Sequence, residues 1–322
     1  MKALNFIEIK NLKKYFGGGG VIHKKPYLKA VDDISFSITK GETFGLVGES
    51  GCGKSTAART IIRLYDPTAG SVIIDGTDIS NLGEKELKPF RRRMQMIFQD
   101  PYASLDPRMT VKRIVSESLS THNICAPVEY EERVAQSLQM VGLDPGHMSK
   151  YPHEFSGGQR QRIGIARALI TQPDFIICDE PISALDVSIQ AQVVNMLQAL
   201  QEQMGLTYLF IAHDLKMVKY ISKRMGVMYL GHLVEVSPSD ELYRAPLHPY
   251  TIGLMRAIPI ADPRLAKKKQ EVSIEGEIPS LFNPPSGCRF STRCRQVMDV
   301  CKTISPALKE VTPNHFVACH LF

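Results

Sequence analysis

The sequence predicts an α/β fold built on a mostly parallel sheet that a helical insertion interrupts. Strands and helices alternate over residues 43–64 and again over 174–236, an order typical of parallel sheets with helical crossovers. Between these stretches, residues 101–171 lose the strand pattern and show only helical periodicity. A glycine-rich loop joins the strand at 43–47 to the helix that follows it, as in phosphate-binding α/β folds.

Alternation of apolar with polar residues predicts the first strands, and short apolar runs predict the later ones. The predicted strands are residues 6–9, 34–38, 43–47, 71–75, 94–98, 174–178 and 207–212, with a strand pair over 227–236. The predicted helices are residues 54–64, 111–119, 131–141, 159–170 and 190–204, with a short helix before the final strand pair. Residues 17–20, four glycines, predict a turn or insertion. Prolines beyond Pro238 predict an appended tail with little helix or strand after about residue 258.

Composition narrows the class of protein. The chain has 322 residues, 43% of them hydrophobic and 22% charged, so a sizeable core is available and wholesale disorder is excluded. The net charge of +6 is spread among 33 acidic residues, which favours an ordinary solvated surface over nucleic-acid binding. No stretch approaches the roughly 18 apolar residues of a membrane helix. The N-terminus also lacks the apolar core of a secretory signal, so we expect a cytoplasmic chain that reaches a membrane only through partners.

Residues 48–55, Gly-Glu-Ser-Gly-Cys-Gly-Lys-Ser, fit the G-x-x-x-x-G-K-[ST] pattern between a predicted strand and a predicted helix. Its glycines let backbone N–H groups surround phosphate oxygens, and the helix N-terminus adds positive potential. Lys54 is predicted to reach the β- and γ-phosphates and Ser55 to bind Mg²⁺. The ATP-binding residues predicted here are Gly48, Ser50, Gly51, Cys52, Gly53, Lys54, Ser55 and Thr56.

Two further segments carry chemistry. The apolar run at 175–178 ends in Asp179 and Glu180, which predicts a buried strand that places one carboxylate to hold Mg²⁺ and the next to act as general base on water. Ser156, Gly157, Gly158 and Gln159 open a predicted helix and make a second anion-binding N-terminus. An ordinary helix cap is the simpler interpretation. A second helix N-terminus able to bind phosphate would have a function if it faced the nucleotide of another subunit.

Together these segments resemble the ATPase subunits of ATP-binding-cassette (ABC) transporters over about residues 5–236. The resemblance implies a Walker A loop at 48–55, a Walker B strand at 175–180 and a signature at 156–159. It also implies that Gln99 binds Mg²⁺ and senses the membrane partner, that Asp186 belongs to the D-loop, and that His213 contacts the γ-phosphate. Phe16 aligns with the aromatic residue that stacks on adenine in this family, and Tyr15 is its neighbour. For each of the two, a place in the core is the alternative.

Residues 48–56, 180–188 and 248–251 are similar to those of oligopeptide and dipeptide importers, and this resemblance implies the remaining expectations. They are ATP hydrolysis at a heterodimer with a paralogous ATPase, two membrane permease subunits, an extracytoplasmic peptide-binding protein, no nucleic acid, and a peripheral place on the cytoplasmic face of the inner membrane. Nickel and glutathione importers share the pattern and stay open as alternatives. A soluble ABC ATPase acting on ribosomes or DNA is the alternative of another class, disfavoured by the single cassette and the short insertion.

The last cysteines of the chain form a group. Cys288, Cys294, Cys301 and Cys319 supply four thiols in a proline-rich tail, and in a cytosolic chain this favours metal ligation over disulfides. The spacing lacks a C-x₂-C pair, and the importer family has a similar tail that resembles a [4Fe–4S] binder. The prediction is therefore an iron–sulfur cluster, with Zn²⁺ as the alternative, and with His320 a bystander.

The motifs divide the chain into four predicted segments. They are residues 1–100 (first part of the nucleotide-binding core), 101–171 (helical signature subdomain), 172–237 (second part of the core) and 238–322 (C-terminal extension with the four-cysteine site).

Overall fold

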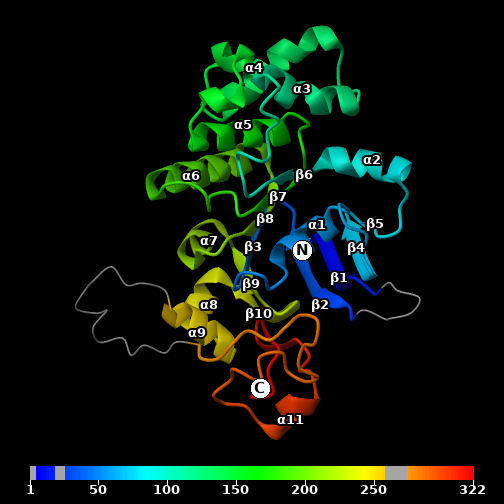
Figure 1. The fold of residues 1–322 in the computed structure, drawn as a ribbon, viewed down its shortest axis with the longest axis vertical. Helices are drawn as coiled ribbons and strands as arrows, with labels where there is room; N and C mark the ends of the chain where they lie inside the picture. Colours follow the sequence, from blue (N-terminus) through cyan, green and yellow to red (C-terminus); the bar gives the residue numbers. More distant parts are fainter. Residues whose placement is uncertain (1–4, 19–25, 258–273) are drawn as a thin grey trace, which may run out of the picture. The chain divides into compact units, whose positions relative to one another are not determined.

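The computed structural model describes residues 5–18, 26–257 and 274–322 (Figure 1). Part of the four-glycine segment and the start of the tail lie outside these residues. The chain divides into two compact units, and each is described by itself. The first unit comprises residues 1–7, 38–43 and 74–212; the second comprises residues 8–37, 44–73 and 213–322.

Three parallel strands form the sheet of the first unit: β6 (Met94–Ile97), β7 (Phe175–Asp179) and β8 (Thr207–Ile211). Ile97 lies opposite Cys178, and Asp179 lies opposite Ile211. Every residue of β7 is buried, which suits a central parallel strand and explains its unbroken apolar run. The structure confirms the three predicted strands to within one residue at each end.

Helices α3 (Val111–Thr121), α4 (Tyr130–Met140) and α5 (Gly157–Leu169) of the first unit pack against one another (Figure 1). Helix α6 (Val187–Met204) follows β7 and begins three residues before its predicted start. Single turns of 3₁₀ helix occur at Pro127–Glu129, Pro145–Ser149 and Pro152–Glu154. The helical periodicity of the insertion is thus confirmed.

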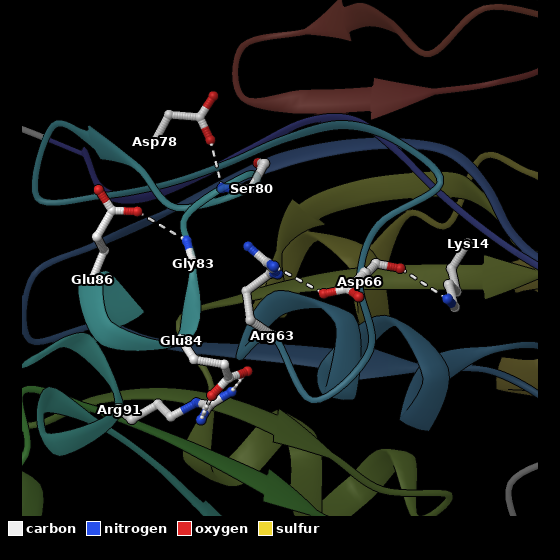
Figure 2. Close-up of polar contacts among 9 residues, drawn as sticks. All are labelled: Lys14, Arg63, Asp66, Asp78, Ser80, Gly83, Glu84, Glu86 and Arg91. Carbon is white, nitrogen blue, oxygen red and sulfur yellow. Dashed lines mark hydrogen bonds and ion pairs between the residues drawn. The ribbon is translucent and has the colours of Figure 1, made fainter. Parts of the chain in front are cut away.

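Helix α2 (Glu84–Arg93) was not predicted from the sequence. Only Leu87 is buried in it, so the helix shows no apolar stripe, and Pro89 lies inside it. Polar contacts stabilise it instead (Figure 2): Glu86 accepts from the N–H of Gly83 at 3.0 Å, and Arg91 donates to Glu84 at 2.5 and 2.9 Å.

The second unit contains parts of two sheets. In one, the strands lie in the order β2 (Leu28–Thr39), β1 (Asn5–Phe16), β4 (Ala69–Ile74); the short β5 (Thr77–Asp78) belongs to the first unit. In the other, β3 (Thr43–Val47) pairs in parallel with β9 (Arg224–Tyr229), which pairs antiparallel with β10 (His232–Pro238). Helix α1 (Lys54–Ile61) follows the glycine-rich loop, and helix α7 (Leu215–Ile221) precedes β9.

The C-terminal extension is more regular than predicted. After α8 (Ser239–Arg244) and α9 (Pro249–Ala257) it forms α11 (Asp299–Thr303) and a hairpin of β11 (Lys309–Thr312) and β12 (His315–Val317). Strand β12 pairs antiparallel with β10, and His315 Nε2 lies 2.7 Å from Glu235 Oε1 with both side chains buried. This long-range pairing ties the end of the chain to the sheet, and no local pattern in the sequence reveals it. Among the described residues, no helix is long and apolar enough to cross a membrane.

Candidate nucleotide-binding site

The glycine-rich loop of the second unit closes around the side chain of Lys54. The Lys54 ammonium donates to the carbonyl oxygens of Gly48 at 2.8 Å and Glu49 at 3.0 Å, and the side chain is almost fully buried. Helix α1 begins at Lys54 itself, so its first-turn N–H groups, which have no intrahelical acceptors, open onto the loop. The arrangement combines a cation with backbone N–H groups at a helix N-terminus, which is the chemistry of an anion site.

Two glycines of the loop are required by contact with neighbouring backbone. A Cβ on Gly48 would lie 2.2 Å from the carbonyl oxygen of Met228, and one on Gly53 would lie 2.1 Å from that of Ala30. Gly53 also has a φ of +105°, a conformation that side chains disfavour. The loop therefore needs glycine at both positions to pass this close to its neighbours.

Phe16 lies half-buried at the end of β1, with its ring edge-on to Tyr65 at 5.3 Å between centroids. Lys14 lies 4.9 Å from the Phe16 ring and donates to the carbonyl of Asp66, whose carboxylate also binds Arg63 (Figure 2). These bonds hold the chain after α1 beside β1. The neighbouring Tyr15 donates instead to Asp32, and burial together with that contact raises the pKa of its hydroxyl.

His213 is exposed and precedes the residue that caps α7. The carboxylate of Asp214 accepts from the N–H groups of Lys216 at 2.8 Å and Met217 at 3.3 Å. These two hydrogen bonds fix the backbone next to His213. They therefore restrict the orientation of His213, which lies in an exposed bend.

In the first unit, the structure brings Glu180 and Gln99 together. Gln99 Nε2 donates to Glu180 Oε2 at 2.5 Å, and both Asp179 and Glu180 are almost fully buried at the carboxyl end of β7. Glu180 has a φ of +50°, which is rare outside glycine, and its N–H donates to the carbonyl of Ile211 at 2.9 Å. A strained backbone held by the neighbouring strand is typical of functional carboxylates.

Ser156 caps α5 through a reciprocal pair of hydrogen bonds. Its hydroxyl accepts from the N–H of Gln159 at 3.3 Å, and its N–H donates to Gln159 Oε1 at 3.0 Å. Ser156 is exposed, and a Cβ on Gly158 would lie 2.7 Å from a methyl group of Ile189. The structure therefore places the predicted signature at an exposed helix N-terminus, closely packed against α6. Asp186 is the exposed residue from which α6 begins.

The four tail cysteines belong to the second unit and form no disulfide. If they were ionised, the negative charges of their thiolates would repel one another. Burial raises the pKa of Cys288 to about 11, against a backbone N–H from Phe290 that lowers it. Cys294 and Cys319 likewise accept from the N–H two residues further on, those of Gln296 and Leu321. Burial is the larger effect and raises the pKa of all three thiols, while the backbone donors aimed at sulfur oppose it by stabilising the thiolate, the form that binds metals.

The histidines near Cys319 have other partners: His315 pairs with Glu235, and His320 Nε2 lies 2.9 Å from the carbonyl oxygen of Ile304. Within the part of the chain that the structure describes, no three histidine, cysteine, aspartate or glutamate side chains are arranged to hold a metal ion.

Sequence reasoning missed the residues that support the loop from the extension. Tyr250 accepts from the N–H of Glu49 at 2.9 Å, and Arg293 pairs with the Glu49 carboxylate at 2.8 Å. Tyr250 lies in a motif that the sequence singles out, but a motif does not reveal its long-range partner. Nothing in the sequence distinguishes Arg293 from the other arginines of the tail.

Comparison with known proteins identifies two matching families. Residues 31–183 match the ABC transporter family, and residues 234–301 match the family "Oligopeptide/dipeptide transporter, C-terminal region". A relative named YkfD, from Bacillus subtilis (strain 168), is 57% identical over 323 residues, covering 100% of this chain and 97% of the relative. The oligopeptide transport ATP-binding protein AppF of the same organism is 54% identical, with 98% and 97% covered.

The oligopeptide transport ATP-binding protein OppF of Bacillus subtilis is also 54% identical, over 97% of this chain and 95% of the relative. Among solved structures, a dimeric ATP-binding cassette, MJ0796, bound to ADP and Pi superposes with a TM-score of 0.65 at 29% identity, covering 72% of this chain and 98% of that one. The chain is therefore similar to oligopeptide transport subunits in sequence and to a solved ATP-binding cassette in fold.

Proposed function

The chain belongs to the ATP-binding subunits of oligopeptide ABC transporters, and we propose which of its residues bind and hydrolyse ATP. It is the ATPase subunit of an oligopeptide import system, with the α/β cassette fold and antiparallel β subdomain of such subunits. This assignment rests on the sequence identity to oligopeptide transport subunits over nearly the whole chain, including the C-terminal region.

For ATP binding, we assign the triphosphate to the loop at 48–56 and the adenine to Phe16. The Lys54 ammonium, which donates to two loop carbonyls, would turn to the β- and γ-phosphates, and charge-assisted bonds would replace neutral ones. The half-buried ring of Phe16, backed by Tyr65, offers a flat surface for a base. His213 would contact the γ-phosphate.

For hydrolysis, Glu180 is the general base in our proposal. Its carboxylate would accept a proton from the attacking water, and the backbone bond to Ile211 would keep it in place during the reaction. Gln99 donates to this carboxylate through its amide nitrogen. The same side chain can therefore orient Glu180 and still offer its amide oxygen to Mg²⁺. Gln99 is thus suited to report on the membrane partner by moving relative to Glu180.

Mg²⁺ fits the residues that the family resemblance assigns to it. A hydroxyl (Ser55), an amide oxygen (Gln99) and a carboxylate (Asp179) are the hard oxygen ligands that this ion prefers. When bound, the ion would neutralise phosphate charge, and we propose these three side chains as its ligands.

The signature at 156–159 faces the nucleotide of a second ATPase subunit in our proposal, and Asp186 lies beside that interface. The exposure of Ser156 and its position at the N-terminus of α5, where the helix dipole favours an anion, support this. Each ATP would then lie between the loop of one subunit and the signature of the other. We propose a paralogous ATPase as the partner, so that the pair forms a heterodimer.

Ser156→Arg is expected to abolish hydrolysis in the assembled transporter while ATP binding by the isolated chain is unchanged. Arginine would fill the space in which the partner's γ-phosphate must approach the helix. Ser120→Arg is the matched control, because it makes the same change at an exposed serine of α3, and we expect it to keep wild-type activity. Wild-type hydrolysis in Ser156→Arg, or weaker ATP binding by the isolated Ser156→Arg chain, would mean that this serine serves only its own helix.

The membrane partners are two permease subunits in our proposal, with an extracytoplasmic peptide-binding protein delivering the cargo. The subunit would lie on the cytoplasmic face of the membrane as a peripheral protein. Oligopeptides are the cargo in the names of the relatives AppF and OppF, and the C-terminal family match is to oligopeptide and dipeptide transporters.

For the tail, we propose that Cys288, Cys294, Cys301 and Cys319 hold a [4Fe–4S] cluster, with Zn²⁺ as the alternative. Three of these thiols accept a backbone N–H, which is how proteins tune cluster-bound thiolates. A cluster bonds each cysteine to a different iron, so the four sulfurs need not converge on one ion as they do for tetrahedral zinc. The cluster would fix a segment that has little core of its own.

Cys294→Ser is expected to lower the bound iron and to make the tail more sensitive to protease, while ATP binding at Lys54 survives. Loss of one ligand weakens the metal site and hence the folding that depends on it. The measurement is iron and acid-labile sulfide per chain in anaerobically purified protein, with Cys125→Ser as the control. One zinc and no iron would establish the alternative, and neither metal with four alkylatable thiols would rule out the site.

A further inference from the structure

Arg293, next to Cys294, reaches the phosphate loop. Its guanidinium makes two bonds to the Glu49 carboxylate, at 2.8 and 3.2 Å, and lies 5.8 Å from the centre of the Tyr229 ring. The Arg293 side chain is only 6% exposed and that of Glu49 only 24%. A two-pronged pair with so little exposure has a fixed geometry, unlike the weak ion pairs of an open surface.

The extension holds the backbone of the same loop residue as well. The Glu49 N–H donates to the hydroxyl of Tyr250, a fully buried side chain of α9. The ring of Tyr250 packs against those of Tyr229 and Phe290, with 4.6 and 5.4 Å between the ring centroids. Phe290 belongs to residues 288–301, the cysteine-bearing segment, so the backbone and the side chain of Glu49 are both attached to the extension.

Glu49 transmits this attachment to Lys54. The carbonyl of Glu49 is one of the two that accept from the Lys54 ammonium, at 3.0 Å. The N–H and the carboxylate of Glu49 thus have partners in the extension, while its carbonyl accepts from Lys54 and from the N–H of Cys52 at 3.3 Å. A shift of Arg293 would move the carbonyl that orients Lys54.

A second arginine repeats the pattern. Arg289, next to Cys288, pairs with Asp32, and both are buried. Asp32 also accepts from the hydroxyl of Tyr15, the neighbour of Phe16. The cysteine-bearing segment therefore contacts the loop proposed for the phosphates, and through Asp32 it is linked to the strand end proposed for adenine.

We propose that Arg293 is a positioning residue for ATP: the Arg293–Glu49 pair orders the phosphate loop, and its two-pronged geometry tunes nucleotide affinity. This inference rests on the proposed function, since it takes Lys54 as the residue that binds ATP. Arg293 would touch no substrate atom, and its effect would appear in affinity rather than in the chemical step.

Arg293→Ala is expected to raise the KM for ATP of the assembled transporter about five- to tenfold and to leave kcat nearly unchanged. Glu49→Gln should have a similar effect, because it removes the same pair from the other side. Arg295→Ala is the matched control, since Arg295 lies on the same segment but pairs with Glu275 at the surface. We expect wild-type KM from it.

Exchange of the two charges separates positioning from a general loss of structure. Glu49→Arg combined with Arg293→Glu should recover most of the wild-type KM, whereas each single change should not. If Arg293→Ala does not fold, Arg293→Lys keeps the charge but loses the two-pronged geometry, and a smaller rise in KM is expected.

A wild-type KM in Arg293→Ala or in a folded Arg293→Lys would overturn the inference, as would a double exchange no better than its single changes. Lys54→Ala decides the proposed function separately. If it loses ATP binding while the arginine variants bind normally, the positioning role alone fails. If it retains ATP binding, the assignment of the loop itself fails.

Discussion

Glu180→Gln is expected to lower ATP turnover by the assembled transporter about a hundred- to ten-thousandfold while ATP binding stays intact. The amide has nearly the shape of the carboxylate, so the backbone bond to Ile211 and the approach of Gln99 should persist. It cannot accept the proton of the attacking water, and the chemical step therefore loses its base. Nucleotide affinity depends on the phosphate loop, which this change leaves untouched.

The measurement pairs steady-state hydrolysis with equilibrium ATP binding in the same preparation. Glu202→Gln on α6 makes the same chemical change at an exposed site of the first unit and should behave like wild type. Turnover near the wild-type rate in Glu180→Gln would show that another group activates the water.

Lys54→Ala is expected to weaken ATP binding by the isolated chain at least about a hundredfold, since charge-assisted bonds to phosphate contribute strongly to affinity. Two bonds to loop carbonyls are lost as well, so the loop would lose the cation around which it closes. Fluorescence titration with a nucleotide analogue measures the affinity, and the melting temperature verifies that the variant folds.

Lys223→Ala provides the control for this change, because Lys223 is an exposed lysine of the same unit. It should bind ATP like wild type. Wild-type affinity in a folded Lys54→Ala chain would contradict the assignment of the phosphate loop.

The parallel strands and the motif loops could be predicted from the sequence because their signals are local. The strand ending at Asp179 is an unbroken apolar run, and the loop before Lys54 carries its glycines at fixed spacing. Helix α2 could not, since only Leu87 in it is buried and its stability comes from polar contacts such as that of Glu84 with Arg91.

The links between the extension and the loop lie beyond sequence reasoning for another reason. The pairs Arg293–Glu49 and Arg289–Asp32 join residues about 250 positions apart, and each member is an ordinary charged residue in its local context. Only the fold brings them together. The strand pairing of β12 with β10, with Glu235 opposite Val317, belongs to the same class of long-range contact.

Peptide uptake by the reconstituted transporter is the decisive measurement of whether this chain powers oligopeptide import. The complete complex would be placed in vesicles with ATP supplied only on the side of this subunit, and a labelled oligopeptide with its binding protein on the other. We expect the peptide to accumulate on the ATP side only when ATP is present, and we expect Glu180→Gln to stop its accumulation. ATP hydrolysis without peptide accumulation, or accumulation that persists in Glu180→Gln, would show that hydrolysis at Glu180 does not drive import.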